Sequence, residues 1–416
     1  MAQISIFHDT LFAYTIRWAS GSRVFRHPDE VDPSILWQDA VRPTAYSASI
    51  QEVPVQVPGE KDSPNSLPKD VEGQSWPDSR QTHLPNPSPS QSIMSLSPTG
   101  TIVIDSDTTR PDLEKGDDTI LVDWYGPDDP ENPLNWSSLR KAWILFQTCF
   151  LTFAVYIGSS IYTAGIADVS DEFHVSHVAA TLGLTMFVLG YGVAPMIFSP
   201  MSEMPQMGRM PIYLVTLAIF VVLQVPTALA TNFGMLLAFR FITGFFGSPI
   251  LGTGGATIAD LYVPKKRAYG ITLWGVFGTS APAMGPLVGG FAAHAKGWRW
   301  TIWELMWLSG SALVVLLFFY PETSASNILY RRAARLREAT GNPNLKSQGD
   351  IDAANMTARD LAAEMLVRPL VLNFQEPIVL ALNIYIGLIY ALLYIWFESF
   401  PIVFIDIYHF EPQLLG

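Results

Sequence analysis

Long apolar segments fill most of the chain after residue 142 and limit what it can fold into. Seven of them, at about 143–165, 178–200, 211–230, 233–258, 269–293, 301–320 and 378–405, have charges mostly in the joints between them. Each is about as long as a helix needs to cross a hydrocarbon core of ~30 Å. Stretches such as Ala218 to Leu223 are apolar without a break, whereas barrel strands alternate. The pattern predicts an all-α integral membrane protein.

Residues 1–141 differ from the rest in charge. They hold 21 Asp and Glu against 11 Lys and Arg, a net charge of −10, so the remaining residues carry only −2 of the total −12. From about Thr44 to Asp118 the segment is rich in Pro, Ser, Asp and Glu and lacks periodic apolar residues. This composition is typical of disorder. We expect 1–141 to be a cytosolic tail, mostly disordered, that acts either as a solvated tail or as a phosphorylated regulatory arm.

The start of the chain is more apolar than the rest of the tail. Its apolar residues include Leu11, Phe12, Tyr14 and Trp18, and they lie close to Arg17. Such a mixture is typical of a segment that lies on a membrane surface. His8, Asp9 and Arg17 interrupt the apolar run, which disfavours a secretory signal peptide.

Basic residues indicate the orientation. Lys265, Lys266 and Arg267 lie between the fourth and fifth spans, and a larger set of basic residues lies between the sixth and seventh. Joints rich in Lys and Arg stay in the cytosol. The joint after the first span carries Asp168 and Asp171 instead. We therefore expect the N-terminus to be cytosolic. The long joint between spans six and seven predicts a surface helix at about 324–336 and a second at about 357–367.

Two motifs lie at the ends of the early spans. Residues 132–136 read N-P-L-N-W directly before the first span. Residues 199–211, after the second span, read S-P-M-S-E-M-P-Q-M-G-R-M-P and contain an acid, Glu203, ahead of the pair Gly208 and Arg209.

Two charged residues lie within the spans themselves. Arg240 begins the string R-F-I-T-G-F-F-G in the fourth span. A guanidinium near mid-membrane costs about 2.5–3.5 kcal/mol, so such a residue usually faces a cavity or a partner; snorkelling to the helix end is the alternative. Glu398 is the acid within the seventh span. It can exchange protons or bind a cationic substrate, or it can simply cap or bond a neighbouring helix.

The fifth span contains a string of glycines with a proline. It reads G-x-x-x-x-x-x-G-P-L-V-G-G, with Gly278, Gly285, Pro286, Gly289 and Gly290. Proline removes a backbone donor and glycine removes the side chain, so this helix can bend and pack closely.

From about Trp124 to Phe410 these motifs resemble the major facilitator superfamily, specifically its fungal drug:proton antiporter group with twelve spans. The resemblance implies an N-terminal six-helix bundle at 142–322, a cytosolic inter-bundle loop at 323–376, and a seventh helix at 377–416 that starts a second bundle. Members carry two six-span bundles, so we expect the sequence to be truncated after its seventh span.

The resemblance also implies roles for residues. Glu203, Gly208 and Arg209 correspond to the cytosolic gate, the glycine-proline string of the fifth span to the antiporter motif, and Arg240 and Glu398 to proton coupling or substrate binding. From their helix positions, we expect the cavity to be lined by Gln147, Tyr156, Tyr162, Phe187, Trp274 and Phe277.

The function that follows is a proton-coupled antiporter that exports small amphiphilic compounds such as drugs, toxins or secondary metabolites, most simply at the plasma membrane. We expect no enzyme activity, cofactor, metal or nucleic acid, and no protein partner is indicated; the partners are substrate, protons and the lipid bilayer. No Gly-Lys-Ser/Thr phosphate loop is present, which indicates a gradient rather than ATP as the energy source. The alternatives are a non-transporting truncated fragment, a half-transporter that depends on a partner, and a seven-span receptor with the opposite orientation.

Overall fold

The structure is a computed structural model of the chain. It describes residues 10–20, 24, 27, 119–355, 367, 371–401 and 403, except for the side chains of 353, 355, 397, 398, 400 and 401. All of these belong to one compact unit, formed by residues 1–42 and 118–416. The predicted disorder between Thr44 and Asp118, nearly all of the second predicted surface helix and the side chain of Glu398 lie outside the described residues.

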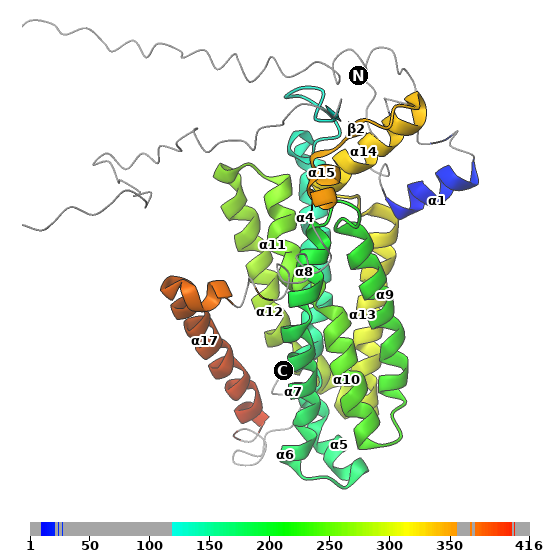
Figure 1. The fold of residues 1–416 in the computed structure, drawn as a ribbon. Coiled ribbons are helices and arrows are strands. Elements are labelled where there is room, and N and C mark those ends of the chain that lie inside the picture. The colour runs from blue at the N-terminus through cyan, green and yellow to red at the C-terminus, as the bar shows by residue number, and fades with distance from the viewer. Residues whose placement is uncertain are drawn as a thin grey trace, which may run out of the picture. The chain divides into compact units, whose positions relative to one another are not determined.

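The apolar segments form helices that lie side by side (Figure 1). Six segments are long and apolar enough to cross a membrane, namely Ser138–Phe173, His177–Glu203, Met210–Ala228, Phe233–Leu261, Trp298–Phe319 and Pro377–Trp396. They confirm the predicted spans at these positions. The ends of the four middle spans agree to within three residues, whereas the first segment is longer than predicted at both ends. The helices are α4 (Ser138–Ser160), α5 (Ile166–Phe173), α6 (His177–Ala180), α7 (Leu182–Val193), α8 (Pro195–Glu203), α9 (Met210–Ala228), α10 (Phe233–Gly247), α11 (Pro249–Leu261), α13 (Trp298–Phe319) and α17 (Pro377–Pro401), with a short 3-10 turn, η3 (Thr163–Gly165).

Two of the spans are broken in their middle. One is divided into α7 and α8 before Pro195, and the other into α10 and α11 before Pro249. Proline has no N–H to donate, so the helical hydrogen bonds are interrupted at these two positions. The backbone stays helical at Ala194 and Ser248, the residues before the prolines.

Helix α12 (Pro264–Lys296) contains the remaining predicted span, 269–293. It is 33 residues long, but its many Gly, Ala, Ser and Thr residues make it less apolar than the six segments above. The segment before α4 nevertheless pairs with the segment after α13, so the number of crossings between them must be even. Five of the six apolar segments lie in that interval. We infer that α12 makes the sixth crossing.

At one end of the bundle a small assembly joins the two segments that flank it (Figure 1). Strand β1 (Ile120–Leu121) pairs in parallel with β2 (Leu345–Lys346), with Ile120 opposite Leu345. The strands pack with helix α14 (Ala325–Thr340) around Val122, Ala333 and Leu336. Helix α15 (Gln348–Asn355) and the 3-10 turn η2 (Pro133–Asn135) complete the assembly. Helix α14 confirms the first predicted surface helix, whereas the sequence analysis did not predict the strand pair.

A buried ion cluster holds this assembly together. Arg332 on α14 donates to Asp129 at 2.7 and 3.1 Å and to Glu131 at 2.8 and 3.1 Å. Glu131 also accepts from Arg335 at 3.1 Å and lies 3.1 Å from Nδ1 of His27. Burial by itself would raise the pKa of Glu131, but the bond to His27 and the two arginines outweigh it and hold that pKa below its usual value. The cluster therefore fixes the segment before the first span onto the helix after the sixth.

The amphipathic start of the chain forms α1 (Leu11–Ala19) beside the same end of the bundle (Figure 1). Thr10 caps it by accepting from the amide of Ala13 at 3.2 Å. The ring of Phe12 lies 5.2 Å from that of Phe318 on α13. Trp18 is 87% exposed.

Candidate functional site

Arg240 on α10 is completely buried between two neighbouring helices. Its Nε donates to the carbonyl of Gly183 on α7 at 3.1 Å, and its Nη2 donates to that of Gly158 on α4 at 3.0 Å. The rings of Tyr162 and Phe187 lie against the guanidinium at 4.7 and 4.5 Å. A snorkelling arginine would reach the helix end, so the burial of this side chain favours the alternative of a residue that faces partners.

The polar environment of Arg240 is incomplete. Its Nη1 is buried and has no hydrogen-bond partner within the described part of the chain. A buried charged donor without a partner carries a desolvation cost. The arrangement therefore leaves a cation with one nitrogen, Nη1, available to an acceptor.

A tyrosine cluster joins the seventh helix to the bundle near this arginine. The hydroxyls of Tyr191 on α7 and Tyr394 on α17 are 3.1 Å apart, and Tyr394 donates to the hydroxyl of Ser159 at 2.9 Å. The ring of Tyr156 packs edge-on against that of Tyr191 at 5.6 Å. Ser159 directly follows Gly158, whose carbonyl binds Arg240. The cluster thus links α17 to the part of α4 that holds the arginine.

Of this cluster, Tyr156 is predicted from the sequence, whereas Tyr191, Ser159 and Tyr394 are not. The aromatic run at the end of the seventh span was the available signal for Tyr394. Tyr191 and Ser159 have no such signal, because hydroxyl side chains are common in spans and their meeting depends on how three helices pack.

The other predicted cavity residues divide into separate groups. Tyr162 and Phe187 contact Arg240, as described above. Gln147 donates to the carbonyl of Phe319 at 3.3 Å, toward α13. Trp274 donates to Thr152 at 2.8 Å, and with Phe277 it packs on an apolar cluster around Cys149. Trp274 and Phe277 therefore lie in one group with each other, and neither belongs to the tyrosine cluster.

The predicted gate loop is held by a different acid from the one expected. Arg209 pairs with Asp260 of α11 at 2.7 Å, whereas Glu203 is exposed at the end of α8. Burial would lower the pKa of Arg209, but the Asp260 carboxylate outweighs it and holds that pKa above its usual value. The role of Glu203 stays a prediction.

Glu322, which the sequence analysis did not select, completes this gate loop. Its carboxylate is buried and accepts from the backbone amides of Arg209 and Met210 at 3.0 and 3.1 Å. It thereby caps the N-terminus of α9, where a negative charge is favoured. Gly208 has φ +76°, and a Cβ there would contact the Glu322 side chain, 2.9 Å from its Cδ. The loop therefore joins α9, α11 and the end of α13.

The glycine-proline string brings α12 against α4. A Cβ at Gly285 would lie 2.7 Å from the backbone nitrogen of Ile161, and one at Gly289 would lie 2.5 Å from its carbonyl oxygen. Pro286 lies inside the continuous helix. Gly278 has its nearest neighbour at 4.0 Å, from Thr152. Two of the motif's glycines, Gly285 and Gly289, therefore allow the backbones of the two segments to approach closely.

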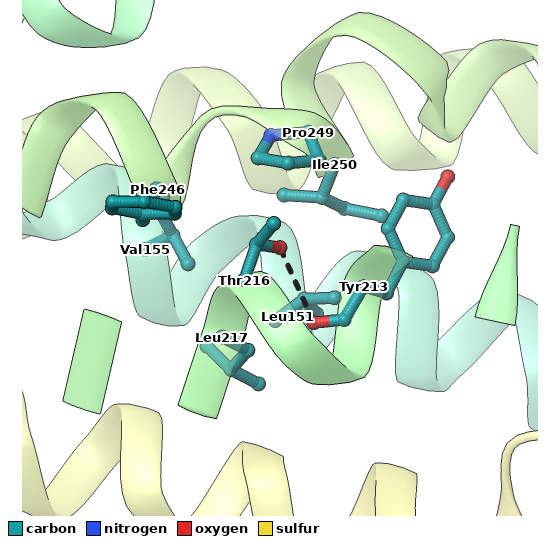
Figure 2. A pocket seen from close by; sticks show the side chains of 9 residues that line it. Leu151, Val155, Tyr213, Thr216, Leu217, Phe246, Pro249 and Ile250 are labelled. Atoms are coloured by element: carbon teal, nitrogen blue, oxygen red, sulfur yellow. Dashed lines mark hydrogen bonds between the residues drawn. The ribbon is translucent and has the colours of Figure 1, made fainter. Parts of the chain in front are cut away.

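A small void lies elsewhere in the bundle and is too small to hold a substrate. Figure 2 shows its lining residues, among them Tyr213, Phe246 and Ile250. Its volume is about 10 Å³, at the lower limit for one water. Among the described residues, no group of three or more His, Cys, Asp or Glu side chains could hold a metal ion.

Comparison with known proteins identifies the family. The model of the Major Facilitator Superfamily matches residues 148–416. Transporter mfs1 of Schizosaccharomyces pombe is 51% identical over 291 residues, covering 70% of this chain and 55% of that protein. Fluconazole resistance protein 1 of Saccharomyces cerevisiae is 46% identical over 75% of this chain and 57% of its own length. Multidrug transporter FLR2 of Candida glabrata is 42% identical over 76% of this chain and 54% of its own length.

The chain spans about half the length of the curated relatives it matches. Their names are those of transporters and of drug-resistance proteins, in agreement with the resemblance read from the motifs. On the extent of the family match and on this identity to fungal transporters, the chain is a multi-pass membrane protein that belongs to the Major Facilitator Superfamily.

Proposed function

We propose that this chain forms part of a proton-coupled antiporter that exports small amphiphilic compounds. Three relatives that share 42–51% identity with it are named as a transporter, a fluconazole resistance protein and a multidrug transporter, and this supports an exporter rather than an enzyme. The observation that carries the proposal is the fully buried Arg240, which has an unpaired donor and lies beside the tyrosine cluster.

The coupling of proton movement to substrate export would depend on a fixed positive charge and a proton that binds and leaves. Arg240 is fixed, because two helix carbonyls and two rings hold it. Glu398 lies on α17, four residues after Tyr394, on the helix that the tyrosine cluster attaches to the bundle. We propose that Glu398 carries the proton and that its charge state decides whether an amphiphilic substrate binds next to Arg240.

The gate would be the loop between α8 and α9. Arg209, Asp260 and Glu322 join three helices at the end where α14 lies, so breaking the ion pair would release α11 from the loop. We propose this network as the cytosolic gate, with Gly208 and Arg209 in the roles predicted for them. The basic joints at the same end support a cytosolic N-terminus, and we propose the plasma membrane as the location.

Export measurements test the proposal. Yeast cells lacking their own drug exporters would express the gene that encodes this chain and be loaded with a fluorescent amphiphilic dye. We expect faster efflux when the external medium is acidic and loss of this acceleration with a protonophore. E398Q should abolish the pH dependence, and K265Q, which removes an exposed cation, should not. Efflux that is insensitive to the protonophore, with normal surface expression, would exclude proton coupling.

A further inference from the structure

A cavity of about 310 Å³ lies between the amphipathic helix α1 and the outer face of α9. It shares no lining residue with the tyrosine cluster or the small void, and it adjoins the gate loop at Met210, whose backbone amide binds Glu322. Its walls are apolar except at one edge. Helix α1 contributes Leu11 and Tyr14, α9 contributes Met210, Pro211, Leu214 and Val215, and α14 contributes Arg331.

The cavity reaches from the end of the bundle into the membrane zone. Met210 begins α9, a membrane-length apolar segment, and Val215 is 59% exposed on its outer face. At about 1.5 Å per residue, Val215 lies roughly 7.5 Å further along the helix than Met210. Amphipathic surface helices bury their apolar face about 5–10 Å into the boundary between headgroups and acyl chains. The cavity therefore spans the depth at which a lipid changes from polar to apolar.

Arg331 supplies a positive charge at the polar edge. Its Nη1 donates to the hydroxyl of Tyr14 at 2.5 Å, and its guanidinium lies 5.1 Å from the Tyr14 ring. A guanidinium has five N–H donors, and within the described part of the chain this hydroxyl is its only hydrogen-bond acceptor. The side chain is half-buried, and among the described residues no acid lines the cavity. The charge is thus held in place with donors to spare.

We propose that this cavity binds an anionic glycerophospholipid, with its phosphate on Arg331 and part of one acyl chain along α9 beneath α1. Arginine pairs well with phosphate through parallel N–H donors, and the apolar wall matches an acyl chain. The volume is at the lower end of the ~300–1,000 Å³ typical of ligand pockets, which fits part of a lipid. A folded protein partner would need about 800 Å² of surface on each side, far more than this cavity offers.

The bound lipid would connect three elements that are distant in the sequence. It would contact α1 from the start of the chain, α9 from the bundle and α14 from the segment after the sixth crossing. Because a ligand that binds only the folded form stabilises it, we expect anionic lipid to raise the thermal stability of the protein and to keep α1 docked.

The experiment uses the full chain purified in mild detergent. Phosphatidylglycerol or phosphatidylcholine with identical acyl chains would be added at the same mole fraction. The readouts are the unfolding midpoint and the lipid retained in native mass spectrometry. Two variants alter the cavity: R331Q removes the charge, and V215W fills the apolar wall. Two matched controls leave it intact: K265Q removes an exposed cation elsewhere, and V222W adds the same bulk on the outer face of α9, where Val222 is 67% exposed.

We expect phosphatidylglycerol, and not phosphatidylcholine, to raise the midpoint of the original chain and of both controls. R331Q and V215W should each lose that increase. R331Q should retain about tenfold less lipid, as loss of a charge-assisted hydrogen bond predicts, and V215W should retain less because the indole occupies the space of the acyl chain. Equal stabilisation by the two lipids would overturn the assignment of the headgroup charge. An R331Q effect no larger than that of K265Q, or a V215W effect no larger than that of V222W, would overturn the site. The unfolding midpoints of all four variants without lipid would be measured as a control for folding.

Discussion

At the scale of the residue, the buried arginine of α10 depends on its shape as well as on its charge. Arg240 bridges carbonyls on two helices with separate nitrogens and presents a flat face to two rings. A lysine keeps the charge but offers a single ammonium on a flexible stem. We therefore expect R240K to fold and reach the membrane, yet to lower dye efflux about tenfold, equivalent to ~1.4 kcal/mol. Efflux equal to that of the original chain would show that charge alone suffices.

Gly208 allows a second prediction at this scale, because two constraints meet there. Its φ is +76°, and a Cβ would contact the Glu322 carboxylate. Gly341 also has a positive φ, +68°, but it has no atom within 4 Å of such a Cβ. Both G208A and G341A incur the left-handed strain of about 1–2 kcal/mol, whereas only G208A displaces the cap of α9. Thermal unfolding should therefore show a clearly lower midpoint for G208A than for G341A; equal midpoints would mean that the cap adds nothing.

At the scale of the element, α14 is attached to the segment before the first crossing by buried charge. R332M leaves Asp129 and Glu131 buried without their main partner, which costs about 3–5 kcal/mol. The pair between Arg337 and Asp350, at 3.1 Å, is more exposed, and R337M should cost less than ~1 kcal/mol. Limited proteolysis should cleave residues 119–137 much faster in R332M than in R337M. Similar cleavage of the two variants would show that the strands and the apolar contacts suffice.

The same cluster predicts a pH dependence. The pKa of Glu131 is lowered in the folded chain, so its contribution to stability is complete above the ordinary carboxyl value of about 4.3 and is lost as the pH falls below it. Protection of residues 119–137 from proteolysis by an acid-active protease should therefore be constant near neutral pH and decline below about pH 4. In R332M that decline should be smaller, because one of the charges that lower the pKa of Glu131 is gone, while His27 and Arg335 remain.

Helix α12 gives a further prediction for an element. It approaches α4 through Gly285, where a Cβ would meet the Ile161 backbone at 2.7 Å, whereas Gly275 on the same helix has no neighbour within 4 Å. A backbone atom cannot rotate away as a flexible side chain can, so the two helices must separate in G285A. We expect a lower unfolding midpoint for G285A and an unchanged or higher one for G275A, since alanine favours helix over glycine by about 1 kcal/mol.

At the scale of the whole molecule, the sequence predicts what depends on local patterns. Apolar runs predicted the spans, and the arginine in R-F-I-T-G-F-F-G proved to be the buried cation. The sequence did not predict partners that meet only on packing. Asp260 and Glu322 hold Arg209 and the loop around it from positions 51 and 113 residues away, and Tyr394 meets Ser159 across 235 residues. Two-residue strands such as β1 are too short to produce a recognisable sequence pattern. Arg332 is one of many basic residues in the loop between the sixth and seventh spans, and nothing in the sequence distinguishes it from the others.

The number of membrane crossings follows from the pairing of the two short strands, and it can be measured. Because β1 pairs with β2, the segments on either side of the first six crossings must lie on one face of the membrane, and α12 must cross although it is the least apolar of the six. After replacing the buried Cys149 by serine, single cysteines at Gly341 and Lys265 should react with an impermeant maleimide only in permeabilised cells. One at Gly297, at the far end of α12, should react in intact cells. Labelling of positions 265 and 297 from the same side would show that α12 does not cross the membrane. The pairing of β1 with β2 would then be wrong as well, because five crossings place those two strands on opposite sides.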